Sequence, residues 1–281
     1  MTSTISMTST KDSEGKYFRV VIYGDSGVGK TLASSTFPAP ILRLNLRTGE
    51  GGGDETLADQ DIDTIQIDDY PSFVQAMVVL RGDYIAADPT APEMAIPADM
   101  MNALRENKDI EKLMKAVQAK KYKTVVIDSF LGLQDLFIKQ SKIFWGKDKG
   151  VKLYGDLSNL TKFWVEFIIQ LPYNFCFVTQ KARVEDQDTG NTYYIPKYPG
   201  NASQDIVNPR MTHILPVEVR PAVEEWAPGR NRWFLTQPDG HYTVKTRIPP
   251  GIALPPYVPA DFARFITNLN KKIHGGTKDA K

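Results

Sequence analysis

Cysteine and histidine are scarce in this chain of 281 residues, which contains one cysteine and three histidines. A single cysteine excludes an intramolecular disulfide and any metal site built from several thiolates. Cys176 lies in the apolar run 175–178, a setting typical of a buried, inert thiol rather than of a nucleophile. The three histidines are far apart and lack the spacing of metal ligands; they are His213, His241 and His274.

An excess of charge of either sign is also missing. Lys and Arg number 34 against 33 Asp and Glu, which gives a formal net charge of +1. This balance neither favours nor excludes a nucleic-acid partner. Any surface that binds nucleic acid must therefore be a local patch rather than a property of the whole protein.

Long hydrophobic runs are absent as well. The most apolar segment, 163–178, contains Glu166 and Pro172 and is too short to span a bilayer. The first 13 residues are rich in Ser and Thr and lack the apolar stretch of a signal peptide. We therefore expect a soluble, cytoplasmic protein that has no membrane partner.

What the chain does have is an alternation of apolar, β-branched runs with helical patterns. With 42% hydrophobic residues it has enough apolar surface for a core. The alternation predicts a mostly parallel sheet flanked by helices on both faces, an α/β fold. Strands are expected at 18–23, 40–46, 64–67, 124–127 and 175–179. Helices are expected from residue 30 and at 72–80, 98–121, 131–144, 157–171 and 261–273.

The last third of the chain has a different pattern. From Arg183 onward, β and turn patterns predominate, and the segments 233–236 and 242–244 flank a turn at 238–240. The proline-containing stretch 88–97 is expected to be a loop. We predict one domain, 16–273, between disordered tails at 1–15 and 274–281.

The most specific motif is a glycine-rich loop of the form G-x-x-x-x-G-K-[ST] at residues 24–31. It follows a predicted strand and opens a predicted helix, the context in which backbone N–H groups cradle phosphate. Lys30 is expected to contact the β- and γ-phosphates, and the Thr31 hydroxyl to ligate Mg²⁺. A glycine-rich turn that binds nothing fits this context poorly. The residues expected to bind ATP are Gly24, Asp25, Ser26, Gly27, Val28, Gly29, Lys30, Thr31 and Leu32.

Asp128 directly follows the apolar strand 124–127, at the edge where open α/β sheets bind ligands. A carboxylate there can hold the metal opposite Thr31, directly or through water. An Asp after a strand is ordinarily a turn residue, and the upstream glycine-rich loop favours the metal role here.

Hydrolysis also requires a group that orients water on the γ-phosphate. Glu50, between glycines in the segment 49–53, is one candidate; a solvated flexible loop is the alternative. Gln180 follows the strand 175–179 and should face the same edge of the sheet, either as a γ-phosphate sensor or as a loop residue.

Four stretches together resemble the phage nucleotide-binding proteins, the Sak-type RecA-like single-strand annealing ATPases. They cover residues 21–38, 122–129, 177–181 and 234–240, and the resemblance spans roughly residues 17 to 255. The first two stretches are common to many P-loop ATPases, whereas the last two narrow the family. Such proteins usually carry an acidic residue at the end of the second strand, where this chain has Asn45 and Arg47.

The resemblance implies a single RecA-like P-loop NTPase core in which one strand separates the strand of Asp128 from that of the P-loop. It also implies ATP-dependent annealing or strand exchange on single-stranded DNA, alongside a single-strand-binding protein, in the host cytoplasm if the protein is phage-encoded. A homo-oligomer, filament or ring, would place ATP at subunit interfaces. Lys245 and Arg247 would then reach the neighbour's γ-phosphate; a solvated basic strand end is the alternative.

Single-stranded DNA requires a positive groove with aromatic platforms. Two predicted loops qualify, 146–152 and 181–198, although the second also carries Glu185, Asp186 and Asp188. Ordinary surface loops are the alternative reading of both. The candidate DNA-binding residues are Lys147, Lys149, Lys152, Lys181, Arg183, Tyr193, Tyr194 and Lys197.

Three other functions compete with a DNA-stimulated ATPase. The irregular acidic position around Glu50 favours a nucleotide-gated DNA-binding module that hydrolyses little ATP. A helicase or packaging motor would need accessory domains, for which 281 residues leave no room. A metabolic kinase would depend on a small acceptor and ignore DNA.

Overall fold

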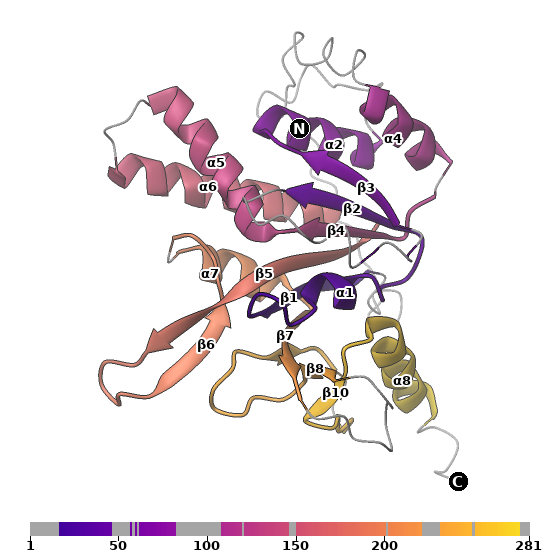
Figure 1. Cartoon of the computed structure of the whole chain (residues 1–281), viewed down its shortest axis with the longest axis vertical. Helices are drawn as coiled ribbons and strands as arrows, with labels where there is room; N and C mark the ends of the chain where they lie inside the picture. Colours follow the sequence, from indigo (N-terminus) through magenta and orange to yellow (C-terminus); the bar gives the residue numbers. More distant parts are fainter. Residues whose placement is uncertain are drawn as a thin grey trace, which may run out of the picture.

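The structure is a computed structural model, and it describes residues 17–46, 57, 60, 62–82, 108–119, 121–145, 150–200, 202–220, 231–248 and 251–275. Its central element is a sheet of ten described strands (Figure 1). The main path through the sheet has the order β10-β8-β7-β1-β5-β4-β2-β3, with β6 paired to β5 and β9 paired to β7.

Parallel strands form the middle of this sheet. They are β1 (Arg19–Gly24), β2 (Ile41–Leu46), β3 (Ile62–Ile67), β4 (Thr124–Asp128), β5 (Asn174–Glu185) and β7 (His213–Val219). All six residues of β1 are buried, as are the first four of β4. Continuous apolar runs of this kind are typical of strands covered on both faces. The predicted separation of the P-loop strand from the Asp128 strand is present, because β5 lies between β1 and β4.

Helices cover both faces of the sheet, but unequally (Figure 1). Residues of α2 (Tyr70–Arg81), α4 (Lys108–Gln118), α5 (Phe130–Trp145), α6 (Gly150–Gln170) and α7 (Ala202–Val207) pack into the larger apolar cluster on one face. On the other face, α1 (Lys30–Ser34) and α8 (Phe262–Gly275) contribute to a smaller cluster. The predicted two-sided α/β layering is therefore correct.

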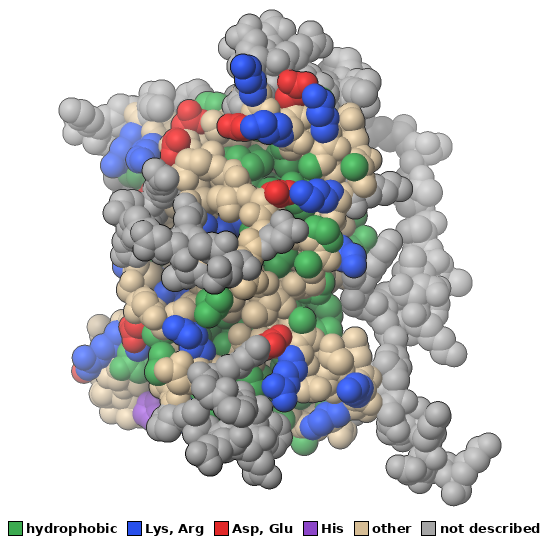
Figure 2. Space-filling view, turned by 45° about the vertical axis from the view of Figure 1, so that its right-hand side comes forward, with side chains coloured by type: hydrophobic (Ala, Val, Ile, Leu, Met, Phe, Trp, Pro, Cys, Tyr) green, Lys and Arg blue, Asp and Glu red, His purple; other side chains and the backbone are tan. Residues whose placement is uncertain are grey.

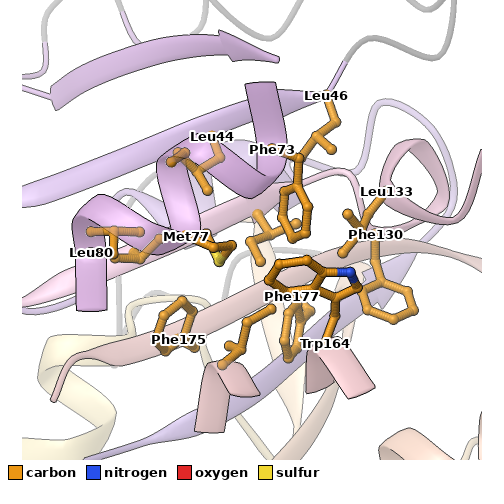
Figure 3. Packing of buried hydrophobic residues seen from close by; sticks show 14 of the residues in the cluster. Leu44, Leu46, Phe73, Met77, Leu80, Phe130, Leu133, Trp164, Phe175 and Phe177 are labelled. Carbon is orange, nitrogen blue, oxygen red and sulfur yellow. The ribbon is translucent and has the colours of Figure 1, made fainter. Parts of the chain in front are cut away.

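Aromatic side chains fill the larger cluster, as Figure 3 shows for Phe73, Phe130 and Trp164. The rings of Phe73 and Trp164 meet edge to face with centroids 4.9 Å apart. The indole N–H of Trp164 donates to the Tyr70 hydroxyl at 3.1 Å, which satisfies its polar atom inside the core. This packing joins α2 to α6 within the cluster that covers one face of the sheet.

The structure corrects several expectations in the second half of the chain. β5 does not end at residue 179; it continues to Glu185 and pairs with β6 (Thr192–Pro196) as an antiparallel hairpin. The predicted loop 181–198 is thus largely a β-ribbon, which projects from the body in Figure 1. Likewise, α6 begins at Gly150 rather than at residue 157, so Lys152 belongs to a helix and not to a loop.

The segments 233–236 and 242–244 do not form a hairpin with each other. β8 (Arg232–Leu235) pairs with β7 and with β10 (Tyr257–Pro259), while Tyr242 makes a single bridge to Tyr194. β9 (Lys245–Thr246) instead pairs with the start of β7. All of these pairings join segments separated by more than a tight turn, which no local turn signal can indicate.

Other boundaries were also displaced. The helix expected at 98–121 is described as α4, which ends at Gln118, and residues 83–107 (including the predicted loop 88–97) lie outside the described residues. The closing helix extends two residues further than expected, to Gly275. The Asp261 carboxylate accepts the backbone N–H of Arg264 at 3.0 Å and caps its start, as an Asp at a helix N-terminus should.

Within the described part of the chain, no helix is both long enough and apolar enough to cross a membrane. On the face shown in Figure 2, the described Lys and Arg side chains are interspersed with Asp and Glu.

Candidate nucleotide-binding site

The P-loop connects the buried strand β1 to the helix α1. Gly29 ends the loop with φ 87°, a left-handed conformation that favours glycine, and serves as the N-cap of α1. Gly24 is required for a different reason, since a Cβ added there would come within 2.7 Å of the Val217 carbonyl oxygen on β7. The loop predicted from the sequence is therefore present, and its first glycine allows β1 to pack closely against β7.

The Lys30 ammonium group folds back over the loop and donates to the Asp25 carbonyl oxygen at 2.6 Å. The Asp25 carboxylate in turn forms an ion pair with Lys181 at 2.6 Å. Lys181 follows Gln180 on β5, and its ammonium lies 4.4 Å from the centre of the Tyr194 ring. An ion pair thus joins the P-loop to the base of the β5–β6 hairpin.

Thr31 and Asp128 meet as the sequence predicted. The Thr31 hydroxyl donates to Oδ2 of Asp128 at 3.0 Å, across the gap between α1 and the end of β4. A threonine held in this way keeps an oxygen lone pair available for a metal ion. The two residues therefore lie together beside the P-loop, as the sequence analysis expects for residues that share a metal ion.

Arg43 is a member of this site that the sequence analysis did not identify. It lies on β2, and its guanidinium donates to Oδ2 of Asp128 from Nε at 3.1 Å and from Nη2 at 3.0 Å. Its side chain is 4% exposed and that of Asp128 is 12% exposed. One signal was present in the sequence: a charged residue in the middle of the apolar strand 41–46.

Polar groups continue from Arg43 along the carboxyl edge of the sheet. Asn45 stands beside Asp128 in the strand register, and its amide donates to Oε1 of Gln66 on β3 at 3.1 Å. Gln66 then donates to Asp68 at 3.0 Å. The Sak-type proteins that the sequence resembles usually have an acidic residue at the end of this strand. Here the end of β2 carries an amide, and Asn45, Gln66 and Asp68 together form a polar row.

Gln180 lies where it was expected. It pairs with Gly24 at the carboxyl end of β1, and its carbonyl oxygen accepts the N–H of Lys197 at 2.8 Å. It therefore stands at the entrance to the P-loop, at the point where β5 leaves the body of the sheet. Glu50, the other candidate for positioning water, lies outside the described residues.

The candidate DNA-binding residues fall into two groups. Lys147 and Lys149 lie outside the described residues, as does the side chain of Lys152 in α6. The remaining five are on the β5–β6 hairpin or next to it: Lys181, Arg183, Tyr193, Tyr194 and Lys197.

Successive side chains of a strand point to opposite faces of the sheet, so the hairpin residues are divided between two faces. Arg183 pairs with Tyr194 and shares a face with Lys181, whereas Tyr193 lies on the opposite face and is exposed. The turn is acidic, and its Asp186 carboxylate accepts two backbone N–H groups, from Asp188 at 2.9 Å and from Thr189 at 3.1 Å. The cationic part of the hairpin is therefore its base.

Lys245 and Arg247 lie away from the P-loop of their own chain. β9 pairs with the first residues of β7, at the amino-terminal end of the parallel strands. The Lys245 ammonium donates to the carbonyl oxygens of Asn208 and Pro209, at 2.7 and 3.0 Å. Arg247 is exposed and donates to the Pro209 carbonyl oxygen at 3.3 Å.

A nucleotide with a divalent metal fits the residues that surround the loop. Arg232, on β8, packs its guanidinium against Gly29, and its buried Nε has no hydrogen-bond partner among the described residues. The Lys30 ammonium donates to a carbonyl oxygen of its own loop, and a phosphate would be a stronger partner. Lys30 and the loop N–H groups would hold the phosphates and Thr31 would hold the metal, which supplies charge neutralisation.

The described residues contain no group of three or more His, Cys, Asp or Glu side chains that could hold a metal ion. Cys176 is buried in β5, and burial raises the pKa of its thiol well above its ordinary value. This agrees with the inert role expected for it.

A parallel sheet with β5 between the P-loop strand and the Asp128 strand, and a Thr31–Asp128 pair at the loop, define a P-loop NTPase. The family model described as "AAA domain" matches residues 16–248, most of the chain. The chain therefore belongs to the AAA domain family and is a nucleotide-binding protein of the ATPase class. A comparison with the curated proteins finds none that matches it.

Proposed function

We propose that this protein is an ATP-hydrolysing, RecA-like recombination protein that anneals or exchanges single-stranded DNA. The observation that carries the proposal is the course of β5. The strand passes Gln180 at the P-loop and continues without interruption into a hairpin whose base is cationic and aromatic. One continuous strand thus connects the nucleotide site with a candidate DNA surface.

The chemistry of the hairpin base supports single-stranded DNA as the ligand. Lys181 and Arg183 offer positive charge for the phosphate backbone on one face of the hairpin, and Tyr193, on the other face, is an exposed ring on which a nucleobase could stack. The carboxylates of the hairpin gather at its turn, away from the P-loop. The DNA would therefore run across the base of the hairpin. Contact with DNA there would act on the same segment that pairs with Gly24.

The test measures ATP turnover and the annealing of complementary oligonucleotides for the wild type, Lys30→Ala and Arg183→Ala. We expect single-stranded DNA to raise wild-type turnover. Lys30→Ala should lower turnover at least about 100-fold. Arg183→Ala should weaken DNA binding and reduce its salt dependence by about 0.7 in the log–log slope. Lys271→Ala, which changes an exposed lysine of α8, is the control for a general loss of charge.

Each rival function predicts a different outcome. Turnover that ignores DNA but requires a small acceptor would indicate a kinase, and separation of a forked duplex would indicate a motor. DNA binding that responds to ATP with negligible turnover would indicate a nucleotide-gated binding module, a reading favoured by Asn45 at the end of β2. Unchanged annealing by Lys30→Ala, together with turnover that does not respond to DNA, would refute the proposal.

We further propose that ATP is hydrolysed between subunits, with Lys245 and Arg247 of one protomer facing the P-loop of the next. Their position at the far end of β7, with Arg247 exposed, leaves them accessible to a neighbouring copy. A mixture of Lys30→Ala and Arg247→Ala proteins tests this. Some mixed interfaces would contain both native residues, so the mixture should exceed the turnover of either variant alone. A mixture no more active than the mean of its components contradicts a shared site.

A further inference from the structure

Asp128 shares its Oδ2 atom among three donors. Arg43 provides two of them, Nε at 3.1 Å and Nη2 at 3.0 Å, and the Thr31 hydroxyl provides the third at 3.0 Å. A carboxylate oxygen has two lone pairs, so this set of donors saturates it. A metal ion could bind Oδ2 only by displacing one of these donors.

The charge of Arg43 also opposes metal binding at Oδ2 of Asp128. The guanidinium of Arg43 is permanently charged and lies with Asp128 in a largely buried setting. Removing a cation from a carboxylate at this depth exposes an uncompensated negative charge, which is costly to bury and attractive to another cation. Arg43 therefore competes with a divalent ion for the same oxygen.

We infer that Arg43 is a positioning residue that prevents Oδ2 of Asp128 from ligating the metal and keeps that oxygen on the Thr31 hydroxyl. Metal binding then depends on the nucleotide's phosphates together with Thr31, and the protein without nucleotide has little affinity for a divalent cation. The polar row supports this geometry, because Asn45, beside Asp128, is 3.4 Å from Nη2 of Arg43 and is itself anchored to Gln66.

This inference rests on the proposed function only in taking the P-loop as a nucleotide–metal site. It requires neither DNA nor turnover. Its test can therefore fail while the proposed DNA activity stands, and the reverse is equally possible.

The experiment measures Mn²⁺ binding to the nucleotide-free protein by electron paramagnetic resonance. Arg43→Gln should bind Mn²⁺ about tenfold more tightly than the wild type, since the carboxylate loses a neighbouring positive charge. The double variant Arg43→Gln, Asp128→Asn should lose that gain. Arg19→Gln, which removes a buried arginine at the opposite edge of the sheet, is the matched control and should leave Mn²⁺ binding unchanged.

Two further readouts separate this role from simple packing. Mn²⁺ should raise the unfolding temperature of Arg43→Gln but not that of the wild type, because a ligand stabilises the state that binds it. Should Arg43→Gln fail to fold, Arg43→Lys keeps the charge and should bind Mn²⁺ within about threefold of the wild type. The inference is overturned if Arg43→Gln binds Mn²⁺ no more tightly than the wild type, or if Arg43→Lys alone gains tenfold.

Discussion

Two buried arginines lie on parallel strands of the same sheet, and their partners lie at opposite ends of those strands and differ in kind. Arg19, at the start of β1, donates to main-chain carbonyl oxygens, including those of Ile169 at 2.7 Å and Leu171 at 2.9 Å. Arg43, on β2, donates to the carboxylate of Asp128 beside the P-loop. One guanidinium ties the end of α6 to the sheet, and the other belongs to the nucleotide site.

The difference indicates a structural role for the amino-terminal edge, where the parallel strands begin, and a role in nucleotide binding for the carboxyl edge, where they end. At the amino-terminal edge, burial lowers the pKa of Arg19 to about 10, and its neutral acceptors are fixed parts of the backbone. At the carboxyl edge, Arg43 faces an ionisable group that also bonds to Thr31. We therefore expect substitutions at the first edge to change stability and those at the second to change nucleotide chemistry.

The largest effect is expected at the carboxyl edge. Lys30→Ala should lower ATP turnover at least about 100-fold, because a charged donor to the transferred phosphate is lost. Its free energy of unfolding should stay within about 0.5 kcal/mol of the wild type. Steady-state phosphate release and urea unfolding measure the two quantities. Lys123→Ala, an exposed lysine just before β4 at the opposite edge, is the control and should change neither.

Arg19→Met should lower stability and leave nucleotide binding unchanged. The variant leaves several carbonyl oxygens without their donor, and we expect it to lose about 4 kcal/mol of unfolding free energy. At temperatures where the variant is folded, ATP affinity should not change. Urea unfolding provides the measurement, with Arg264→Met on the exposed face of α8 as the control. A loss below about 1 kcal/mol would remove the distinction between the two edges.

His213, also at the amino-terminal edge, should make stability depend on pH. Burial among Phe18, Phe262 and Phe265, with a further contribution from Arg247, lowers the pKa of His213 from 6.5 to about 4. The unfolded chain therefore binds more protons between these values, and stability present above pH 6.5 is lost as the pH falls toward 4. The loss should reach about 3 kcal/mol.

Urea unfolding at several pH values tests this dependence. His213→Phe should flatten the wild-type slope between pH 6.5 and 4. His241→Phe, at an exposed position, should leave the slope as it is. Equal slopes in the wild type and His213→Phe would contradict a buried neutral histidine as the source.

The smallest effect concerns the link between the P-loop and the hairpin. Asp25→Asn should release Lys181 from its ion pair and strengthen binding of single-stranded DNA by about threefold. Stability should change by less than about 1 kcal/mol, since the Asp25 side chain is 59% exposed. Fluorescence anisotropy with a labelled oligonucleotide measures the change, and Asp205→Asn is the control at an exposed site of α7. Weaker DNA binding by Asp25→Asn would contradict this coupling.

The sequence predicted those parts of the molecule whose signal is local. The P-loop, the strand before Asp128 and the Asp261 cap each depend on neighbouring residues, and each is present in the structure. Arg43 was missed because its partner lies 85 positions away and on another strand. The β5–β6 hairpin was taken for a loop because β5 changes from apolar to polar at Gln180, where it leaves the core.

The central claim is that the nucleotide site and the hairpin base act together on single-stranded DNA. The most direct test is the rate of ATP turnover at saturating ATP, with and without single-stranded DNA, for the wild type and Arg183→Ala. The account predicts a DNA-dependent increase in the wild type that is reduced in Arg183→Ala, while the rates without DNA are the same. Wild-type turnover that is identical with and without single-stranded DNA would contradict it.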